Sequence, residues 1–457
     1  MCAVSSAPGR DDRRATACVR AAYLGSPRVL AIFAIHQRIP LLHILQLGLH
    51  HGKCACLLAR LPDLILFQIH TTQILILITL WPFSRTLYDH AIRYTKGSFG
   101  LLLILMCQWF APTKLRITFE TEGKGKLSTE QIERIAVKDE RGNVVSLNLP
   151  TKFVYISNHQ IYLDWWYAWN LMYFIGDGLH RSVYITLKNS LQWIPVLGPA
   201  MQFYGFIFLA RSCSSRLSVC LAVSDRLIQG FLTALNSLHI CLPSERLQRK
   251  KTIHSCSSST PRVRTLVSKN TRPISKKFAD KQGISDMTNI LLPRSTGLHY
   301  SLRSLSPRIP DLKLIDITTV YPGIPPLRYG QDYYTLRSVF LNRVPPPEIH
   351  MHLRMFDVAT EVPIGDLSQT NPSVLPSSAE SPVEVDIPEK EKDFFDSWLR
   401  SLWHEKDESI TRWFDTNSFA QSNIEIPLRL RRKREIFDAF AFFIPAGIDY
   451  LWARMRR

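Results

Sequence analysis

The chain of 457 residues is 46% hydrophobic, and its 56 Lys and Arg against 38 Asp and Glu give a formal net charge of +18. A chain of this length holds about two or three domains, and its apolar content excludes a disordered or fibrous protein. The positive charge predicts an anionic partner, either nucleic acid or an anionic membrane surface. The nine Cys include no repeated Cys-x-x-Cys pair, so we expect reduced thiols and no metal site.

Residues 1–60 are predicted to be an irregular N-terminal arm. Arg and Ala dominate its start, and histidines and basic residues interrupt its later apolar run. The order of a signal peptide, with a basic start, a short apolar core and a small-residue cleavage site, is missing. Two interpretations stay open: a targeting arm, or upstream sequence outside the working protein.

Residues 61–112 are predicted to form membrane-associated helices. The apolar run 64–83 approaches the roughly 20 residues that a bilayer span requires, and Trp81 and Arg85 stand where interfacial anchors belong. A second apolar run, 97–110, is too short to span upright and favours a re-entrant or interfacial helix. The alternative is that both runs are buried helices of a soluble domain.

Residues 113–365 alternate between strand and helix patterns, which predicts an α/β domain. The predicted strands are 115–120, 153–157 and 183–187, and a helix with an aromatic face is predicted over 162–175.

Asn158 and His159 directly follow the predicted strand 153–157, and Asp164 comes five positions after His159. A histidine at the end of a buried strand, with a carboxylate near enough to hold its ring, has the layout of a general base. On spacing alone, an ordinary His–Asp pair on a surface or in a core is the more common case.

A second block, 188–211, ends in an apolar strand that delivers Arg211, after a helix punctuated by glycines. An arginine at a strand end is suited to bind a phosphate or carboxylate bidentately. Lys188 closes the strand 183–187 and is a candidate for phosphate or coenzyme A contact. A surface ion pair for Arg211 and a solvated side chain for Lys188 fit the pattern equally well.

Together, Asn158-His159-(four residues)-Asp164 and the Ile-Pro…Gly…Phe…Arg pattern of 194–211 resemble the glycerophospholipid acyltransferase family. The eukaryotic lysophosphatidate and lysocardiolipin or lysophosphatidylinositol acyltransferases are the most similar branch. The resemblance covers 61–211 and resumes from about 265 to 366, where its blocks are 275–281, 292–297 and 320–325. It implies a glycerolipid acyltransferase domain, a mixed sheet flanked by helices, with membrane-associated helices at both ends of the chain.

The resemblance also implies a reaction: acyl transfer from acyl-CoA to the free hydroxyl of a lysophospholipid such as lysophosphatidic acid. His159 would take the hydroxyl proton, and Asp164 would fix the histidine tautomer. Arg211 would hold the acceptor phosphate, with Asn158 and Lys188 as further substrate-binding residues. Acyl-CoA is then a substrate and no resident cofactor is expected.

The expected location is the endoplasmic reticulum membrane. Two alternatives stay open: acyl-chain remodelling of lysophosphatidylinositol or lysocardiolipin, and a catalytically dead membrane scaffold that binds lipid.

Residues 212–264 depart from the family pattern, which has an apolar strand leading into Phe-Pro-Glu-Gly-Thr, whose Glu and Gly help to bind the acceptor. This stretch is rich in Ser, Cys, Leu and Arg without a coherent period, which predicts a poorly structured insertion. If the third base of each codon of 249–264 is read with the first two bases of the next, the result is compatible with Glu-Lys-Asp-His-Pro-Leu-Met-Leu-Ile-Leu-Tyr-Pro-Glu-Gly-Thr. We therefore hypothesise that a retained intron, a misplaced splice junction or a sequencing error puts this segment out of frame.

The last part of the chain is predicted to contain a polar linker, 366–392, rich in Ser, Pro and Glu, and C-terminal amphipathic and membrane helices over 393–457. Aromatic residues at helical spacing in 394–414 predict an amphipathic helix that lies on a membrane or packs on the core. The basic cluster 428–434 before the apolar run 436–452 favours a membrane hairpin or anchor. No aromatic RNA-binding motif accompanies the charge, so no nucleic-acid partner is expected.

Overall fold

The computed structural model describes residues 54–209, 255–258, 276–277, 279–281, 283–307, 309, 311–367, 387–420 and 422–455. The chain divides into two compact units. The larger unit comprises Leu66–Pro372 and Glu384–Phe442, and the smaller one comprises Met1–Ile65, Ser373–Val383 and Phe443–Arg457. Arg211, the predicted insertion 212–264 apart from 255–258, and most of the predicted arm 1–60 and linker 366–392 lie outside the described residues.

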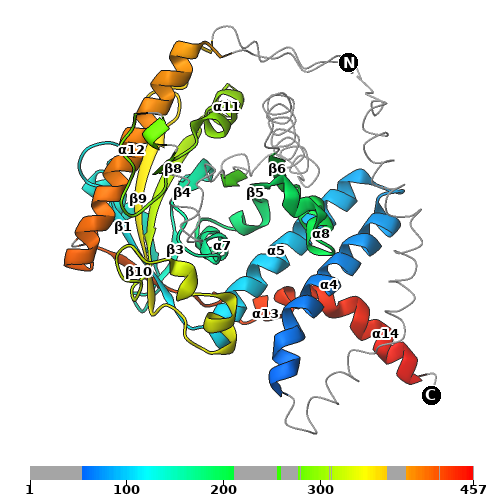
Figure 1. Ribbon diagram of the computed structural model, residues 1–457. Coiled ribbons are helices and arrows are strands. Elements are labelled where there is room, and N and C mark those ends of the chain that lie inside the picture. The colour runs from blue at the N-terminus through cyan, green and yellow to red at the C-terminus, as the bar shows by residue number, and fades with distance from the viewer. Residues whose placement is uncertain are drawn as a thin grey trace, which may run out of the picture. The chain divides into compact units, whose positions relative to one another are not determined.

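An eight-stranded mixed sheet lies at the centre of the larger unit (Figure 1), in the order β10-β1-β9-β8-β4-β7-β5-β6. The strands are β1 (Lys114–Phe119), β4 (Lys152–Ser157), β5 (Val183–Lys188), β6 (Ile207–Leu209), β7 (Ser255–Ser258), β8 (Lys313–Val320), β9 (Glu348–Asp357) and β10 (Ile424–Pro427). All neighbours from β8 to β6 are parallel, β8 and β9 are antiparallel, β9 and β1 are parallel, and β1 and β10 are antiparallel. This confirms the predicted mixed sheet of an α/β domain.

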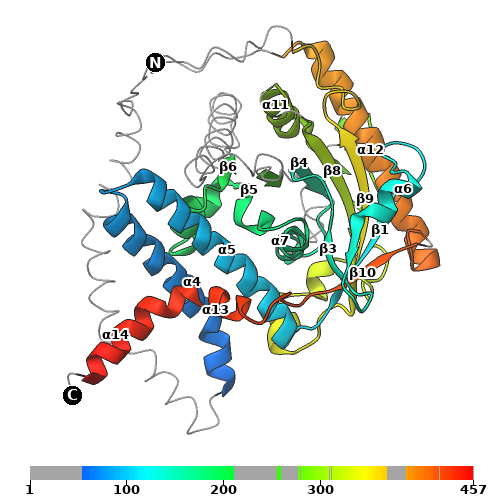
Figure 2. The same ribbon diagram turned by 180° about the vertical axis from the view of Figure 1, so that it is seen from behind.

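Helices cover both faces of this sheet (Figures 1 and 2). The described helices up to Phe443 are α4 (Cys54–Leu80), α5 (Arg85–Phe110), α6 (Thr129–Ile135), α7 (Asp164–Phe174), α8 (Leu197–Phe203), α11 (Ser295–Leu305), α12 (Glu389–Thr416) and α13 (Glu435–Ala439), with short turns η1 (Leu179–Ser182), η2 (Asn189–Trp193), η4 (Gly330–Asp332), η5 (Arg337–Leu341) and η6 (Ala441–Phe443). A two-stranded ribbon is formed by β2 (Ala136–Lys138) and β3 (Val144–Leu147). The helices α11 and α12 share a core with Val154 and Ile156 of β4, whereas α5 and α7 cover the opposite face.

The strand β7 occupies a central position, paired with β4 on one side and β5 on the other. Central strands of parallel sheets are normally continuous apolar runs, yet β7 has the sequence Ser-Cys-Ser-Ser. In the shifted frame described above, the codons of Ser255–Ser258 contribute to the apolar run Met-Leu-Ile-Leu. The placement supports the out-of-frame hypothesis and differs from the expectation that all of 212–264 is irregular.

The helices α4 and α5 extend over the two apolar runs predicted near the membrane. Ser84 caps α5 by accepting a hydrogen bond from the backbone N–H of Leu87. The middle of α5, Leu101–Leu105, is almost completely buried, as the alternative of a buried helix expects. In the part of the chain that the structure describes, no helix has both the length and the apolar character to cross a bilayer, so the predicted membrane-crossing helices find no support there.

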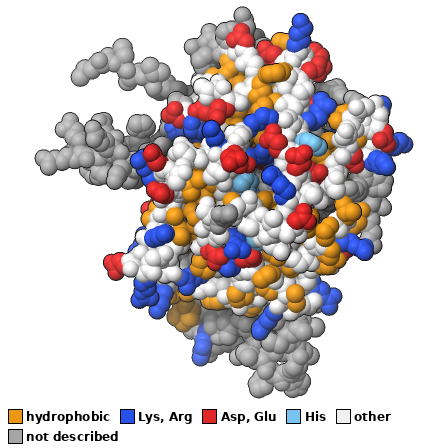
Figure 3. All heavy atoms as spheres, turned by 90° about the vertical axis from the view of Figure 1, so that its left-hand side faces the viewer, with side chains coloured by type: hydrophobic (Ala, Val, Ile, Leu, Met, Phe, Trp, Pro, Cys, Tyr) orange, Lys and Arg blue, Asp and Glu red, His pale blue; other side chains and the backbone are white. Residues whose placement is uncertain are grey.

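The helix α12 resolves the alternatives left for 394–414, because it packs on the core. The apolar side chains on its inner face recur at helical spacing and are at most 3% exposed; they are Phe395, Leu399, Leu402, Trp403, Ile410 and Trp413. Acidic and basic side chains are interspersed on the side of the molecule that carries α12 (Figure 3). The apolar run predicted over 436–452 is divided into α13, η6 and α14 (Ile444–Met455), with Pro445 in the first turn of α14, where proline is tolerated.

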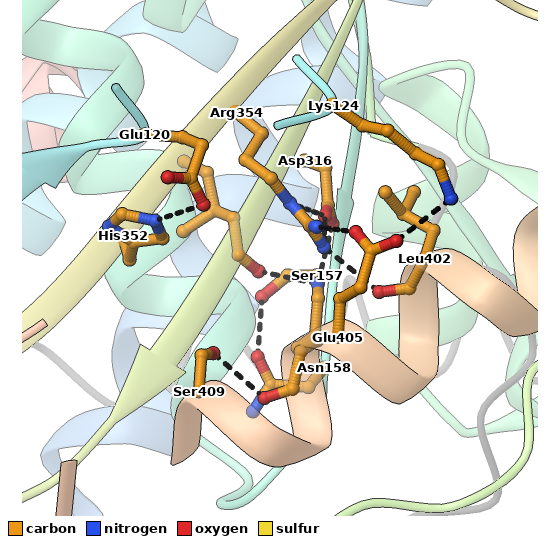
Figure 4. A network of polar contacts seen from close by, with 12 residues as sticks. Glu120, Lys124, Ser157, Asn158, Asp316, His352, Arg354, Leu402, Glu405 and Ser409 are labelled. Atoms are coloured by element: carbon orange, nitrogen blue, oxygen red, sulfur yellow. Dashed lines mark hydrogen bonds and ion pairs between the residues drawn. The ribbon is translucent and has the colours of Figure 1, made fainter. Parts of the chain in front are cut away.

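A buried ion cluster fastens α12 to the sheet (Figure 4). Asp316 of β8 accepts hydrogen bonds from Arg354 of β9, at 2.8 Å from Nη2 and 3.1 Å from Nε. Its other oxygen accepts a 2.5 Å bond from Nζ of Lys406 on α12. Asp316 and the Lys406 side chain are fully buried, and burial lowers the pKa of Lys406 to about 8. The two cations and the shared carboxylate therefore join three elements of the core.

Candidate active site

The loop 158–163 connects β4 to α7 and begins with Asn158, which is buried. The Asn158 side chain donates to the backbone carbonyl of Thr319 at 2.9 Å and accepts from the Thr319 N–H at 2.8 Å. These bonds tie the end of β4 to the end of β8 and fix the backbone from which His159 projects. The predicted contact between Asn158 and substrate stays a prediction.

His159 and Asp164 lie together, as the spacing predicted. The Nδ1 atom of His159 donates to Oδ2 of Asp164. The same oxygen accepts from the backbone N–H groups of Gln160 at 2.6 Å and Ile161 at 3.1 Å. The histidine side chain is 30% exposed, against 14% for the aspartate. With Nδ1 donating to a carboxylate, Nε2 carries the free lone pair and can accept a proton.

Tyr321 completes the set of hydrogen-bond donors around Asp164, a role that was not predicted, although Tyr321 lies in the family-like block 320–325. It follows β8 directly, is completely buried, and donates from its hydroxyl to Oδ1 of Asp164 at 2.5 Å. Burial and the neighbouring Asp164 carboxylate raise the pKa of Tyr321 well above its ordinary value, so the phenol is a neutral donor. Asp164 therefore has four hydrogen-bond donors that hold it in one orientation against His159.

Lys188 lies at the same edge of the sheet as His159. It is the last residue of β5 and is exposed, and β5 and β4 both run parallel to β7 between them. Two strand spacings put the ends of β4 and β5 about 10 Å apart, which is compatible with contacts to different parts of one extended substrate. Arg211 lies outside the described residues.

The aromatic face predicted for 162–175 packs behind this site. The buried indoles of Trp166 and Trp169 donate to the carbonyls of Leu103 and His180, at 3.2 and 3.0 Å. These bonds fix the start of α7, which carries Asp164. The arrangement is a rigidly held His–Asp pair, and such a pair is chemically able to take a proton from a weak nucleophile such as a hydroxyl.

Comparisons with known proteins agree with this chemistry. The family model described as Acyltransferase matches residues 141–261. The 2-acyl-1-lysophosphatidylinositol acyltransferase of Saccharomyces cerevisiae is 33% identical over 341 residues, which are 72% of this chain and 76% of that protein. The chain belongs to the glycerophospholipid acyltransferase family.

Two further relatives of this acyltransferase extend the comparison. An uncharacterized acyltransferase of Schizosaccharomyces pombe is 28% identical over 373 residues, 81% of this chain and 89% of that protein. Lysocardiolipin acyltransferase 1 of Gallus gallus is 25% identical over 262 residues, 57% of this chain and 54% of that protein. No solved structure matches the chain. The family match contains His159, Asp164 and Lys188, and it runs through β7 to Pro261.

Proposed function

We propose that this acyltransferase transfers an acyl group from acyl-CoA to the free hydroxyl of a lysophospholipid. The observation that carries the proposal is the His159–Asp164 pair, held by Tyr321 at the edge of the sheet. Two relatives are named as acyltransferases of lysophosphatidylinositol and of lysocardiolipin, and these names support a lysophospholipid as the acceptor.

The proposed reaction needs no covalent acyl-enzyme. Nε2 of His159 takes the proton of the acceptor hydroxyl while its oxygen attacks the thioester carbonyl of acyl-CoA. The new C–O bond forms, the C–S bond breaks, and the departing coenzyme A sulfur receives the proton from the imidazolium. Asp164 stabilises that imidazolium, and its four donors keep it from turning away. Acyl-CoA is a substrate, and the reaction uses no resident cofactor.

The acceptor head group has two candidates. A lysophosphatidic acid-like acceptor was expected from the sequence, with Arg211 on its phosphate and Lys188 near the same edge. The 33% identity to the yeast 2-acyl-1-lysophosphatidylinositol acyltransferase favours lysophosphatidylinositol, and hence acyl-chain remodelling. A lysophospholipid acceptor resides in membranes, so the proposed location is a membrane, with the endoplasmic reticulum as the expected compartment. The net charge of +18 suits an anionic leaflet.

The test is acyl transfer by membranes from cells that express the chain, with labelled acyl-CoA and each of the two acceptors. His159→Ala should lower kcat by at least about 100-fold, the low end of a general base's contribution. His404→Ala is the matched control, because the His404 side chain on α12 is 64% exposed and pairs with nearby Glu408. Full activity of His159→Ala would show that His159 is not the base. A wild-type chain without activity would favour the lipid-binding scaffold, or an acyltransferase inactivated by the out-of-frame segment.

A further inference from the structure

The segment 327–344, which connects β8 to β9, exposes large apolar side chains beside the site. Leu327, Leu336 and Val344 are 60%, 53% and 57% exposed, and Leu341 and Tyr333 are exposed as well. Isolated apolar side chains on a surface are ordinary, but five within one short segment form an exposed apolar patch, which is typical of an interaction site.

The same segment is basic. Arg328, Arg337 and Arg343 are exposed, and Asp332 is its one acidic residue. Two of the exposed residues have left-handed backbone conformations, Leu327 with φ 62° and Arg343 with φ 56°. Residues with a Cβ adopt this region at a cost. Packing elsewhere in the segment must therefore hold these side chains outward.

That packing is against the loop that carries His159. The backbone N–H of Tyr162 donates to Gln331 at 3.3 Å, and the rings of Phe340 and Trp166 lie 4.7 Å apart. Gly330 touches the loop so closely that an added Cβ would lie 2.6 Å from Ile161 and 2.8 Å from the Gln160 carbonyl. The exposed patch therefore borders the site, and Tyr162, which is 54% exposed, extends it from the loop.

We infer that these residues form a docking surface for an anionic lipid bilayer: Tyr162, Leu327, Arg328, Tyr333, Leu336, Arg337, Leu341, Arg343 and Val344. Leucines and tyrosines insert at the boundary between head groups and acyl chains, while interleaved arginines bind lipid phosphates. The inference rests on the proposed function, because a lysophospholipid acceptor would reach His159 from a bilayer on which this surface lies.

The test is co-sedimentation of the full chain with vesicles of phosphatidylcholine containing phosphatidylserine, and with vesicles of phosphatidylcholine alone. Each arginine near an anionic surface contributes about fivefold to binding. Arg328→Gln/Arg337→Gln/Arg343→Gln should therefore weaken binding to the anionic vesicles by about 100-fold. Leu327→Ser/Leu336→Ser should weaken binding to both kinds of vesicle.

The matched controls are on α12, where Arg412→Gln removes an exposed arginine and Phe394→Ser an apolar side chain that is 67% exposed. Both should bind vesicles within about twofold of wild type. Patch variants that bind as wild type does would overturn the inference. So would self-association of the wild-type chain without lipid that the patch variants abolish, because the partner would then be a second copy.

Acyl transfer to a water-dispersed, short-chain lysophospholipid separates this inference from the proposed function. The patch variants should retain wild-type turnover on that acceptor and lose turnover on vesicles. Loss on both acceptors would place these residues in the substrate site and overturn the docking role. An inactive wild-type chain that shows the predicted vesicle binding would refute the proposed function and leave the docking surface standing.

Discussion

Asp316 is the shared anion of the buried cluster, and replacing it by Asn should loosen α12 from the sheet. The Asp316→Asn variant leaves Lys406 and Arg354 facing a neutral amide, where wild type has contacts of 2.5 and 2.8 Å. Removing one partner of a buried pair costs about 3–5 kcal/mol. Arg354 keeps its 2.8 Å pair with Glu405 but cannot lose its proton. The expected cost is a large part of the roughly 5–15 kcal/mol that stabilises a domain.

Urea unfolding followed by far-ultraviolet circular dichroism measures this cost, and hydrogen exchange of α12 peptides shows where the structure opens. The control is Asp396→Asn on α12, whose ion pair with Arg400 is about one-third exposed on both sides and should contribute about 0–1 kcal/mol. Adding Lys406→Met to Asp316→Asn should restore part of the loss, because one uncompensated cation is removed. Equal costs for Asp316→Asn and Asp396→Asn would refute the reasoning.

Three other predictions concern Lys406, Tyr321 and the segment 249–264. In the folded chain the pKa of Lys406 is about 8, below its ordinary 10.5, so the unfolded chain binds this proton more tightly. Between these pH values, the free energy of unfolding of wild type relative to Lys406→Met should therefore rise with pH by up to about 3 kcal/mol. A difference that does not depend on pH would contradict the assignment. Tyr321→Phe should lower kcat about 10- to 100-fold by removing one donor to the Asp164 charge; Tyr334→Phe, whose hydroxyl instead donates to the Pro322 carbonyl at 2.6 Å, should stay near wild type, and equal losses would argue against a positioning role. Sequencing transcripts across codons 249–264 should reveal a form that encodes the apolar strand, and a single transcript in the present frame would refute the hypothesis.

The sequence predicted the His159–Asp164 pair because both residues belong to one short loop at the end of a strand, where spacing alone brings them together. Tyr321 was missed because it is 157 positions from Asp164. Only the parallel pairing of β4 and β8 brings it to the site. Asn158 shows the same limit, since its partner Thr319 is 161 positions away.

The helix α12 shows what periodicity leaves undecided. The spacing of its aromatic residues predicted an amphipathic helix, but a pattern does not say whether the apolar face meets lipid or protein. Lys406 lies on that buried face, and its partner Asp316 is 90 positions away. The strand β9 was not predicted, although its polar and apolar residues alternate as in a strand; the alternation would also have predicted a solvent-facing side. In the fold those residues, His350, His352 and Arg354, are 2–7% exposed.

The position of β7 shows which parts of the site an out-of-frame segment would change and which parts it would leave intact. The hydrogen-bond donors to Asp164 come from the β4–α7 loop and from the end of β8, on one side of the site. The strand β7 lies on the other side of β4, with Ser258 level with Tyr155. In the shifted reading, the Glu-Gly pair follows the codons of this strand in the sequence. An error at 249–264 would thus change the chemistry facing the base and the packing of a central strand, while the geometry of the His–Asp pair stays intact.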